Sequence, residues 1–235
     1  MKIAIDADSL LYAANWKMEK DDKDITWAVD WFHKRIKHIM EAFEEEYSKE
    51  VKTVKIVFSS DSNFRKEIDP EYKANRPERP LAINKIKQRV MEDNPMMIRI
   101  VEGFEADDVV KWLNTYFDYD VASPDKDVKS QMQVCFDYQK NYFTDILTDE
   151  EIEFNIWKQC IVGDRSDNIK GINGIGPKGA EIFLSDFGLD FEAICTISEN
   201  YQSFVDTMNL IRLDQMDANG NLELWIPEES KYVGA

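Results

Sequence analysis

Acidic side chains recur along this sequence at positions where runs of apolar, β-branched residues end. Asp6 closes the first such run and Asp61 follows the second. Further carboxylates come after the later runs, as Glu105, Asp107, Asp108, Asp125, Asp127, Asp164 and Asp167. Carboxylates gathered at one spot repel one another unless cations lie between them. Mg²⁺ prefers such oxygen ligands, and two of these ions about 4 Å apart can activate a water and stabilise the leaving oxygen of a phosphodiester.

The spacing within this set favours a shared site. Glu105 and Asp108 are three residues apart and would share one helix face, as would Asp164 and Asp167, while Asp125 and Asp127 would share a face in an extended turn. Any single acid could instead cap a helix or occupy an exposed turn, because Asp favours both positions. The recurrence at strand ends favours metal binding for the set. Asp8 could lie behind the metal ligands or cap the next helix, and the set leaves it out.

A glycine-rich turn is a second candidate site. It comprises Gly171, Gly174, Ile175 and Gly176 and leads into Pro177 and Lys178. Glycine lets a backbone approach a ligand closely, and proline suits the first turn of a helix. Amides at that helix start could hold a phosphate, with Lys178 beside them. The pattern is typical of a helix-hairpin-helix, which grips the DNA backbone without reading sequence; a merely structural tight turn is the alternative.

The charge of the chain is unevenly distributed. The 235 residues carry a formal net charge of −17 at pH 7, which would repel a polyanion if it were evenly spread. Between Arg65 and Arg89, however, eight Lys and Arg face four Asp and Glu, a local balance of +4. This basic stretch is a candidate phosphate-contact zone, and a solvated charged helix is the alternative interpretation.

Composition excludes several classes of protein. Hydrophobic residues make up 43% of the chain, which is enough for a sizeable core, and no run of about 18 apolar residues predicts a membrane span. The first residues lack the pattern of a signal peptide. The three cysteines are odd in number and widely spaced, which favours reduced thiols over disulfides or zinc ligands. We therefore expect a cytoplasmic protein, most simply a monomer, with no membrane partner.

The elements that must position these residues alternate between strands and helices. Strands are expected near residues 2–8, 51–60, 96–101, 119–122 and 133–138, and helices over 26–47, 83–91, from 105 and from 148 to 160. Thr148 and Glu151 form a capping box at the start of the last of these helices. The alternation predicts an α/β domain with a largely parallel sheet over residues 1–162, followed by a helical subdomain over 163–235. Ligands of such sheets bind beyond the carboxyl ends of the strands.

Together these motifs resemble the 5′ nuclease superfamily, which includes flap endonucleases, the 5′-nuclease domain of DNA polymerase I and phage 5′–3′ exonucleases. The matching motifs occupy, in order, residues 5–8, 58–62, 63–76, 102–108, 123–127 and 162–168, and they run into the glycine turn. The finer resemblance is to bacteriophage 5′–3′ exonucleases. It implies a mostly parallel central sheet flanked by helices (a PIN-like fold) with a helix-hairpin-helix subdomain. It also implies the cytoplasm of a host cell if a phage encodes the chain.

The resemblance also implies a role for each motif. The first Mg²⁺ would be held or oriented by Asp6, Asp61, Glu105, Asp107 and Asp108, and the second by Asp125, Asp127, Asp164 and Asp167, with Mn²⁺ as a substitute. Lys73 and Arg76 would contact the scissile phosphate. Arg65 would add a DNA contact and Tyr72 would stack on a terminal base. Residues 62–95 would form a helical arch, shorter than in many relatives, and the glycine turn would hold duplex backbone with a K⁺ ion.

The expected function is hydrolysis of double-stranded or branched DNA at or near 5′ ends, in phage-type replication or degradation. RNA in RNA–DNA hybrids is a further expected substrate. An RNase with a related α/β fold and an acidic active site is one alternative, but an RNase activity does not explain the glycine turn. A non-catalytic DNA-binding module is another. The sequence leaves open whether exonuclease or flap endonuclease activity predominates.

Overall fold

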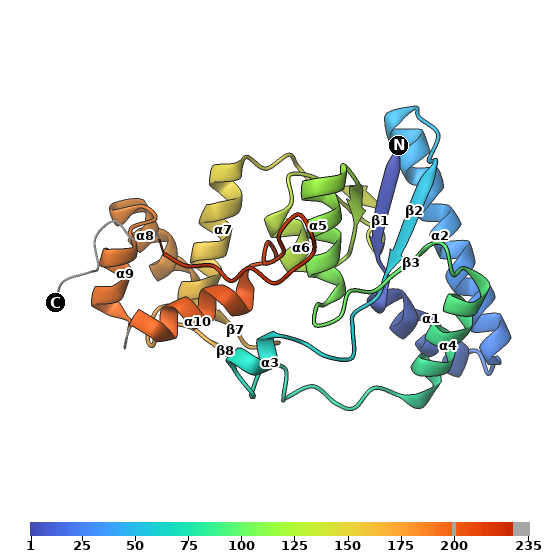
Figure 1. Ribbon diagram of the computed structural model, residues 1–235, viewed down its shortest axis with the longest axis horizontal. Helices are drawn as coiled ribbons and strands as arrows, with labels where there is room; N and C mark the ends of the chain where they lie inside the picture. The colour runs from blue at the N-terminus through green and yellow to red at the C-terminus, as the bar shows by residue number, and fades with distance from the viewer. Residues whose placement is uncertain (199–200, 228–235) are drawn as a thin grey trace. The chain divides into compact units, whose positions relative to one another are not determined.

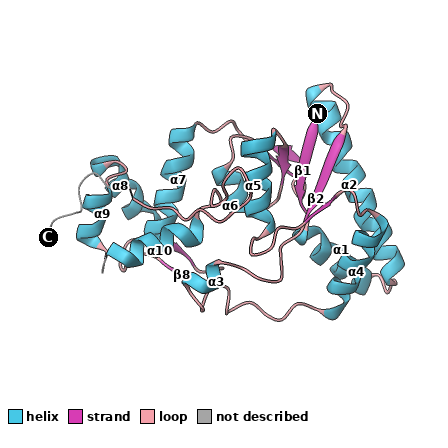
Figure 2. Cartoon of the chain, in the orientation of Figure 1, coloured by secondary structure: helices cyan, strands magenta, loops and turns pink. Residues whose placement is uncertain are grey.

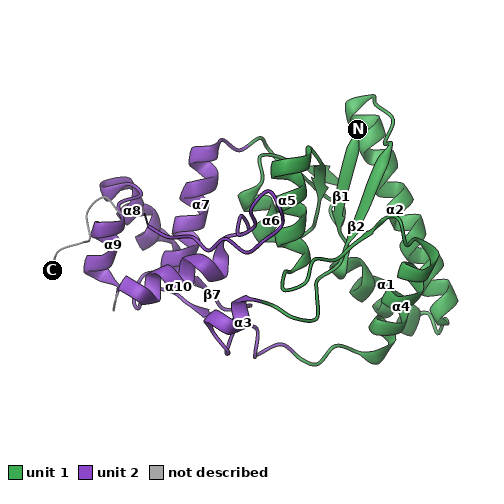
Figure 3. Ribbon diagram, viewed as in Figure 1, with its two compact units in different colours: residues 1–63, 77–146 green, residues 64–76, 147–235 purple. Residues whose placement is uncertain are grey.

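A six-stranded sheet forms the centre of the first of two compact units (Figure 1). The computed structural model describes residues 1–198 and 201–227. The first unit comprises residues 1–63 and 77–146, and the second comprises residues 64–76 and the chain from residue 147 onward (Figure 3). The strands of the sheet in unit 1 are β1 (Lys2–Asp6), β2 (Thr53–Val57), β3 (Ile98–Arg99), β4 (Asp120–Ala122), β5 (Cys135–Asp137) and β6 (Tyr142–Phe143).

The sheet is parallel except at one edge. Its strand order is β3-β2-β1-β4-β5-β6, and β1 pairs in parallel with both β2 and β4. Among the described strands of this sheet, β6 alone runs antiparallel to its neighbour, β5. The predicted α/β fold with a largely parallel sheet is therefore confirmed. Because β1 is central, Asp6 at its carboxyl end lies between the loops that follow β2 and β4.

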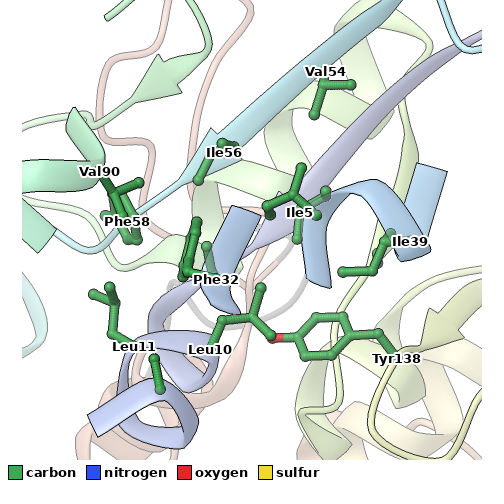
Figure 4. Close-up of a cluster of buried hydrophobic side chains, with 14 of the residues drawn as sticks. Ile5, Leu10, Leu11, Phe32, Ile39, Val54, Ile56, Phe58, Val90 and Tyr138 are labelled. Atoms are coloured by element: carbon green, nitrogen blue, oxygen red, sulfur yellow. The ribbon is translucent and has the colours of Figure 1, made fainter. Parts of the chain in front are cut away.

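Helices pack on the sheet and supply most of the core of unit 1. They are α1 (Asp8–Lys20), α2 (Ile25–Tyr47), α4 (Leu81–Asp93), α5 (Ala106–Phe117) and α6 (Lys126–Gln131). Apolar residues of α2 recur every three or four positions, so one face of the helix is buried. That face, which includes Phe32, packs with α1, α4 and alternate residues of β1 and β2 such as Ile5 and Ile56 (Figure 4). Helix α5 contacts β1, β2 and β4.

Unit 2 consists mainly of helices with a short pair of strands (Figure 2). Its elements are α3 (Arg65–Ile68), α7 (Asp149–Val162), β7 (Gly163–Asp164), β8 (Ile169–Lys170), α8 (Pro177–Phe187), α9 (Phe191–Ile197) and α10 (Tyr201–Ile211). The predicted capping box opens α7, where the Thr148 hydroxyl accepts a hydrogen bond from the Glu151 amide. Strands β7 and β8 form an antiparallel hairpin between α7 and α8.

The unit boundary differs from the one that local sequence patterns suggest. Helix α7 ends at the expected boundary, residue 162, yet Ile156 and Trp157 on it pack with Met208 of α10 in the core of unit 2. Residues 64–76 also belong to unit 2, and the ring of Tyr72 lies in the same core. The stretch expected to form one arch, residues 62–95, is thus shared between units, with α3 in one and α4 in the other. Among the described helices, none is both long and apolar enough to cross a bilayer.

Two backbone segments of unit 2 approach each other closely at Gly171, and a substitution there tests this packing. A Cβ atom at this position would lie 2.2 Å from the carbonyl carbon of Val162 and 2.4 Å from the carbonyl oxygen of Ile161. Because backbone cannot give way as a flexible side chain would, Gly171→Ala should lower the free energy of unfolding by about 3 kcal/mol. Thermal unfolding should show a fall in Tm of about 6–12 °C. Gly176→Ala is the control, since a Cβ there meets nothing within 4 Å; equal melting of the two variants would contradict the packing described.

Candidate functional site

Asp6 ends the central strand and is nearly buried. Its Oδ2 accepts a hydrogen bond of 2.7 Å from the Ser123 hydroxyl, and its Oδ1 accepts one of 3.4 Å from the amide of Asp8. Burial raises the pKa of Asp6 to about 7, and the neighbouring carboxylates of Asp8 and Asp125 add to the rise. Three carboxylates from the loops after β1 and β4 therefore lie within electrostatic reach of one another. A cation between them would relieve their repulsion.

Asp8 belongs to this group, although sequence reasoning left it out of the metal set. Its Oδ2 accepts a hydrogen bond of 3.3 Å from the amide of Ser59, whereas its buried Oδ1 has no hydrogen-bond partner. A carboxylate oxygen can only accept, so burial without a donor is costly unless a cation binds it. The donor set thus fits a divalent ion. The signal in the sequence was the spacing of two residues from Asp6 at a strand end.

Two serines tie the loops around these acids together. The Ser59 hydroxyl accepts a hydrogen bond of 2.9 Å from the Ala106 amide at the start of α5, and its carbonyl accepts one of 2.9 Å from Lys87 Nζ. The Ser123 hydroxyl, besides donating to Asp6, accepts from the Asp125 amide at 3.1 Å. These bonds connect the chain after β1, β2, β3 and β4. Sequence reasoning missed both serines.

The other acids of unit 1 lie at helix starts and in a turn. Asp108 is fully buried, and its carboxylate accepts a hydrogen bond of 3.1 Å from the Glu105 amide in a capping box that opens α5. Asp107 is half-buried in the same turn. Asp125 is exposed at the N-cap of α6, where its side chain accepts from the Asp127 amide at 2.7 Å. Asp61 is exposed in the bend after β2.

No group of three or more His, Cys, Asp or Glu side chains encloses a metal position within residues 1–198 and 201–227. Mg²⁺ does not require such a cage, because it commonly keeps several waters and binds one or two carboxylates together with substrate phosphate. The ligand set derived from the sequence stays a prediction, to which Asp8 is now added.

In unit 2, Asp164 ends β7 and Asp167 lies within the turn between β7 and β8, and both are nearly buried. Asp164 Oδ1 accepts from both the amide and the hydroxyl of Ser166, at 2.8 and 2.6 Å. Its Oδ2 accepts from Gln159 Nε2 at 3.2 Å. These bonds hold the Asp164 carboxylate in one orientation.

Asp167 contacts Lys73 and Arg76, the two cationic residues that the sequence predicts at the scissile phosphate. Its carboxylate contacts Arg76 Nη2, Lys73 Nζ at 3.5 Å and the Tyr72 hydroxyl at 3.3 Å. Its backbone carbonyl accepts a hydrogen bond of 2.9 Å from the Lys73 amide. Lys73 adopts a left-handed backbone conformation with φ of +56°, which is uncommon outside glycine. The structure therefore places Lys73 and Arg76 together, on one carboxylate.

Two residues that were predicted to contact DNA, Arg65 and Tyr72, are buried in unit 2. Tyr72 is 3% exposed, so its ring contributes to the core and is not available for stacking on a base in this structure. Arg65 is 1% exposed. Its Nε donates to the carbonyl of Leu210 at 2.8 Å and its Nη2 to the carbonyl of Arg212 at 2.7 Å. Direct contact between Arg65 and DNA would require this end of α10 to open.

The glycine turn connects β8 to α8 and is largely exposed. Gly176 is the N-cap of α8 and Pro177 follows in the first turn, as the sequence predicts. Helix α7, the β7–β8 strand pair, the glycine turn and helix α8 follow one another along the chain, and the helix-hairpin-helix stays a prediction. A cavity of about 710 Å³ adjoins the turn, lined also by Arg165 and Lys170 and by Ser203 and Thr207 of α10. Exposed amides at a helix start beside two cations suit a phosphate backbone.

Comparisons with known proteins identify a family that the sequence matches. Residues 2–154 match the family described as 5′-3′ exonuclease, N-terminal resolvase-like domain. The chain is 35% identical over 156 residues to a DNA polymerase I of Borreliella burgdorferi, covering 56% of this chain and 17% of that protein. It is 28% identical over 167 residues to a 5′-3′ exonuclease of Aquifex aeolicus, covering 63% and 56%. The chain thus spans less than two thirds of the length of these relatives.

Solved structures resemble the chain in fold. The 5′-exonuclease of bacteriophage T5 with bound zinc matches with a TM-score of 0.64 and 21% identity, covering 91% of this chain and 89% of that one. The catalytic core of Rad2 in complex with a DNA substrate matches with a TM-score of 0.56 and 17% identity, covering 82% and 62%. These likenesses show the same mostly parallel sheet flanked by helices.

Proposed function

Because the chain belongs to the 5′-3′ exonuclease family, we propose that it is a divalent-metal-dependent 5′ nuclease that hydrolyses DNA at or near 5′ ends. The observation that carries the proposal is the pair of carboxylates at the end of the central strand, of which Asp6 is buried and Asp8 is half-buried. One buried oxygen of Asp8 accepts no hydrogen bond, and the pKa of Asp6 is raised. A bound cation would stabilise both carboxylates in their charged form. The T5 exonuclease with bound metal ions supports the same chemistry by analogy.

Each residue then has a chemical role. Asp6, Asp8, Asp61 and Asp125 would hold one Mg²⁺, with Glu105, Asp107, Asp108 and Asp127 orienting its ligands, and Asp164 and Asp167 would contribute to a second ion. The bound ions supply an activated water and stabilisation of the leaving oxygen. Lys73 and Arg76 bind the scissile phosphate and offset the charge that develops in the transition state. Mn²⁺ would substitute for Mg²⁺.

Unit 2 would hold the substrate. Gly171, Gly174, Ile175, Gly176 and Lys178 would contact the phosphate backbone of a DNA duplex through amides and one cation, with a K⁺ ion at the turn. Such contacts carry no sequence information, so the proposed substrate is any double-stranded or branched DNA with a 5′ end. RNA in RNA–DNA hybrids is a second proposed substrate. We place the enzyme, as a monomer, in the cytoplasm and in phage-type DNA replication or degradation.

Chelation of the metal provides the direct test. Blunt, nicked and flapped duplexes labelled at the 5′ or the 3′ end are incubated with the protein and Mg²⁺, with and without EDTA. Short products should appear from the 5′ label first, and EDTA should abolish cleavage until Mg²⁺ or Mn²⁺ is restored in excess. Binding of duplex DNA without cleavage under every metal condition would instead identify a DNA-binding module. Faster cleavage of single-stranded RNA than of duplex DNA would identify an RNase.

A further inference from the structure

The segment that carries Lys73 and Arg76 has an unusual connection to the rest of the protein. Residues 64–76 pack in unit 2, yet the chain on both sides of them, at residues 63 and 77, belongs to unit 1. No covalent link inside unit 2 therefore holds the segment in place. Its position within that unit depends on non-covalent contacts alone.

Arg65 supplies the contact at the start of the segment. Its guanidinium donates to the carbonyls of Leu210 and Arg212, where α10 ends. Carbonyls at the last turn of a helix have no partner within the helix, and a positive charge there is favoured by the helix dipole. The centroid of the Phe64 ring lies 4.6 Å from the guanidinium carbon of Arg65. A planar guanidinium can reach two carbonyls in fixed directions, which a lysine cannot do.

The other end of the segment is held by the turn that contains Asp167. The Lys73 amide donates to the Asp167 carbonyl at 2.9 Å, Asn168 Nδ2 donates to the Glu71 carbonyl at 2.8 Å, and Asn75 Nδ2 donates to the Arg165 carbonyl at 3.0 Å. The segment is thus fixed at both ends, by Arg65 to α10 and by these bonds to the β7–β8 turn. Loss of either anchor would let the two cations shift.

We propose that Arg65 is a positioning residue for phosphate binding: it fixes the segment to α10 so that Lys73 and Arg76 keep their place beside Asp167. The inference rests on the proposed function, since it assigns those two cations to the scissile phosphate. It replaces the direct DNA contact expected of Arg65 with an indirect role. A residue that only stabilised unit 2 would affect the fraction of folded enzyme, whereas a positioning residue affects the turnover of the folded enzyme.

The test compares the anchor with another buried residue of the same unit. Arg65→Met removes the anchor. Ile194→Ala is the control, because Ile194 is fully buried on α9 in the core of unit 2 and is not among the hydrogen-bond partners of residues 64–76 named above. At a temperature where both variants are folded, Arg65→Met should lower kcat for a 5′-labelled duplex by about 100-fold with little change in KM, as expected for a misplacement of about 1 Å at the reacting phosphate. Ile194→Ala should lose stability but keep kcat close to that of the wild type.

A double-mutant comparison identifies the route of the effect. In a background of Lys73→Ala with Arg76→Ala, Arg65→Met should cause no further loss of kcat, because the groups it positions are already absent. A further loss of the same size would show that Arg65 acts on DNA directly, and would overturn the proposal. A wild-type kcat in Arg65→Met would overturn it as well.

If Arg65→Met fails to fold, Arg65→Lys keeps the charge but cannot span both carbonyls, so it should give an intermediate kcat and faster hydrogen exchange at the Lys73 amide. Wild-type kcat and exchange in Arg65→Lys would refute the anchor. Failure of the proposed function is distinguishable from failure of this inference, since in that case the wild-type protein itself would leave the labelled DNA intact.

Discussion

Replacement of Asp125 by alanine is expected to lower the rate of DNA cleavage by at least about 1000-fold, because a metal ion at such a site supplies several kcal/mol of transition-state stabilisation. Asp125 is exposed, so its loss leaves the core intact. Its proximity to Asp6 shows in the raised pKa of Asp6, to which the Asp125 charge contributes. DNA affinity should be kept, since the substitution removes a negative charge from a surface that meets a polyanion.

The matched control is Asp24→Ala. Asp24 is also an exposed N-cap of unit 1, where its side chain accepts from the Trp27 amide at 2.8 Å. Both substitutions remove a capping bond worth about 1 kcal/mol, but only one removes a proposed metal ligand. Single-turnover cleavage of a 5′-labelled duplex in Mg²⁺ gives the rate, and fluorescence anisotropy in EDTA gives the affinity. Equal cleavage by the two variants would refute the assignment of Asp125.

Substitution of the paired cations should affect both rate and binding. Lys73→Ala or Arg76→Ala is expected to lower kcat by about 100- to 1000-fold, the range seen when one donor to a developing negative charge is removed. Each should also reduce the slope of log affinity against log salt by about one, because one phosphate contact is lost. The left-handed backbone of Lys73 is equally demanding for alanine, so the change isolates the side chain.

Lys66→Ala is the comparison for both variants. Lys66 is exposed in α3, within the same short segment, and no role is assigned to it. It should leave kcat unchanged and alter the salt dependence little. If Lys66→Ala matched Lys73→Ala in both measurements, the effect would reflect the general charge of the segment. The specific roles proposed for Lys73 and Arg76 would then be refuted.

The sequence predicted those features of the fold that depend on local pattern. The alternation of apolar runs and helical periodicity indicated the parallel sheet, and the helix expected over residues 26–47 is found as α2, Ile25–Tyr47. The capping box at Thr148 located the start of α7 correctly. Strands expected over 51–60 and 96–101 are shorter, at Thr53–Val57 and Ile98–Arg99. The residues after β2 leave the sheet to form the loop that carries Ser59 and Asp61.

Features that depend on distant partners could not be predicted in this way. The sequence around Arg65 indicates a surface cation in a basic stretch. Its hydrogen-bond partners are instead the carbonyls of Leu210 and Arg212, 145 and 147 residues further along the chain. The burial of Tyr72 depends likewise on helices of unit 2. Ser59 and Ser123 have no distinctive spacing, and their importance lies in hydrogen bonds to Asp8 and Asp6 from other strands. The strand-end acids were recognisable because parallel topology itself brings such positions to one edge.

The interleaving of the chain between the two units has a consequence for fragments of the protein. A single proteolytic nick can yield two pieces, but no choice of position makes those pieces correspond to unit 1 and unit 2. A nick between residues 146 and 147 would leave the C-terminal piece without Tyr72, whose ring fills part of its interior. The N-terminal piece would retain that tyrosine with nothing to cover it, so each half would depend on the other to complete an apolar core.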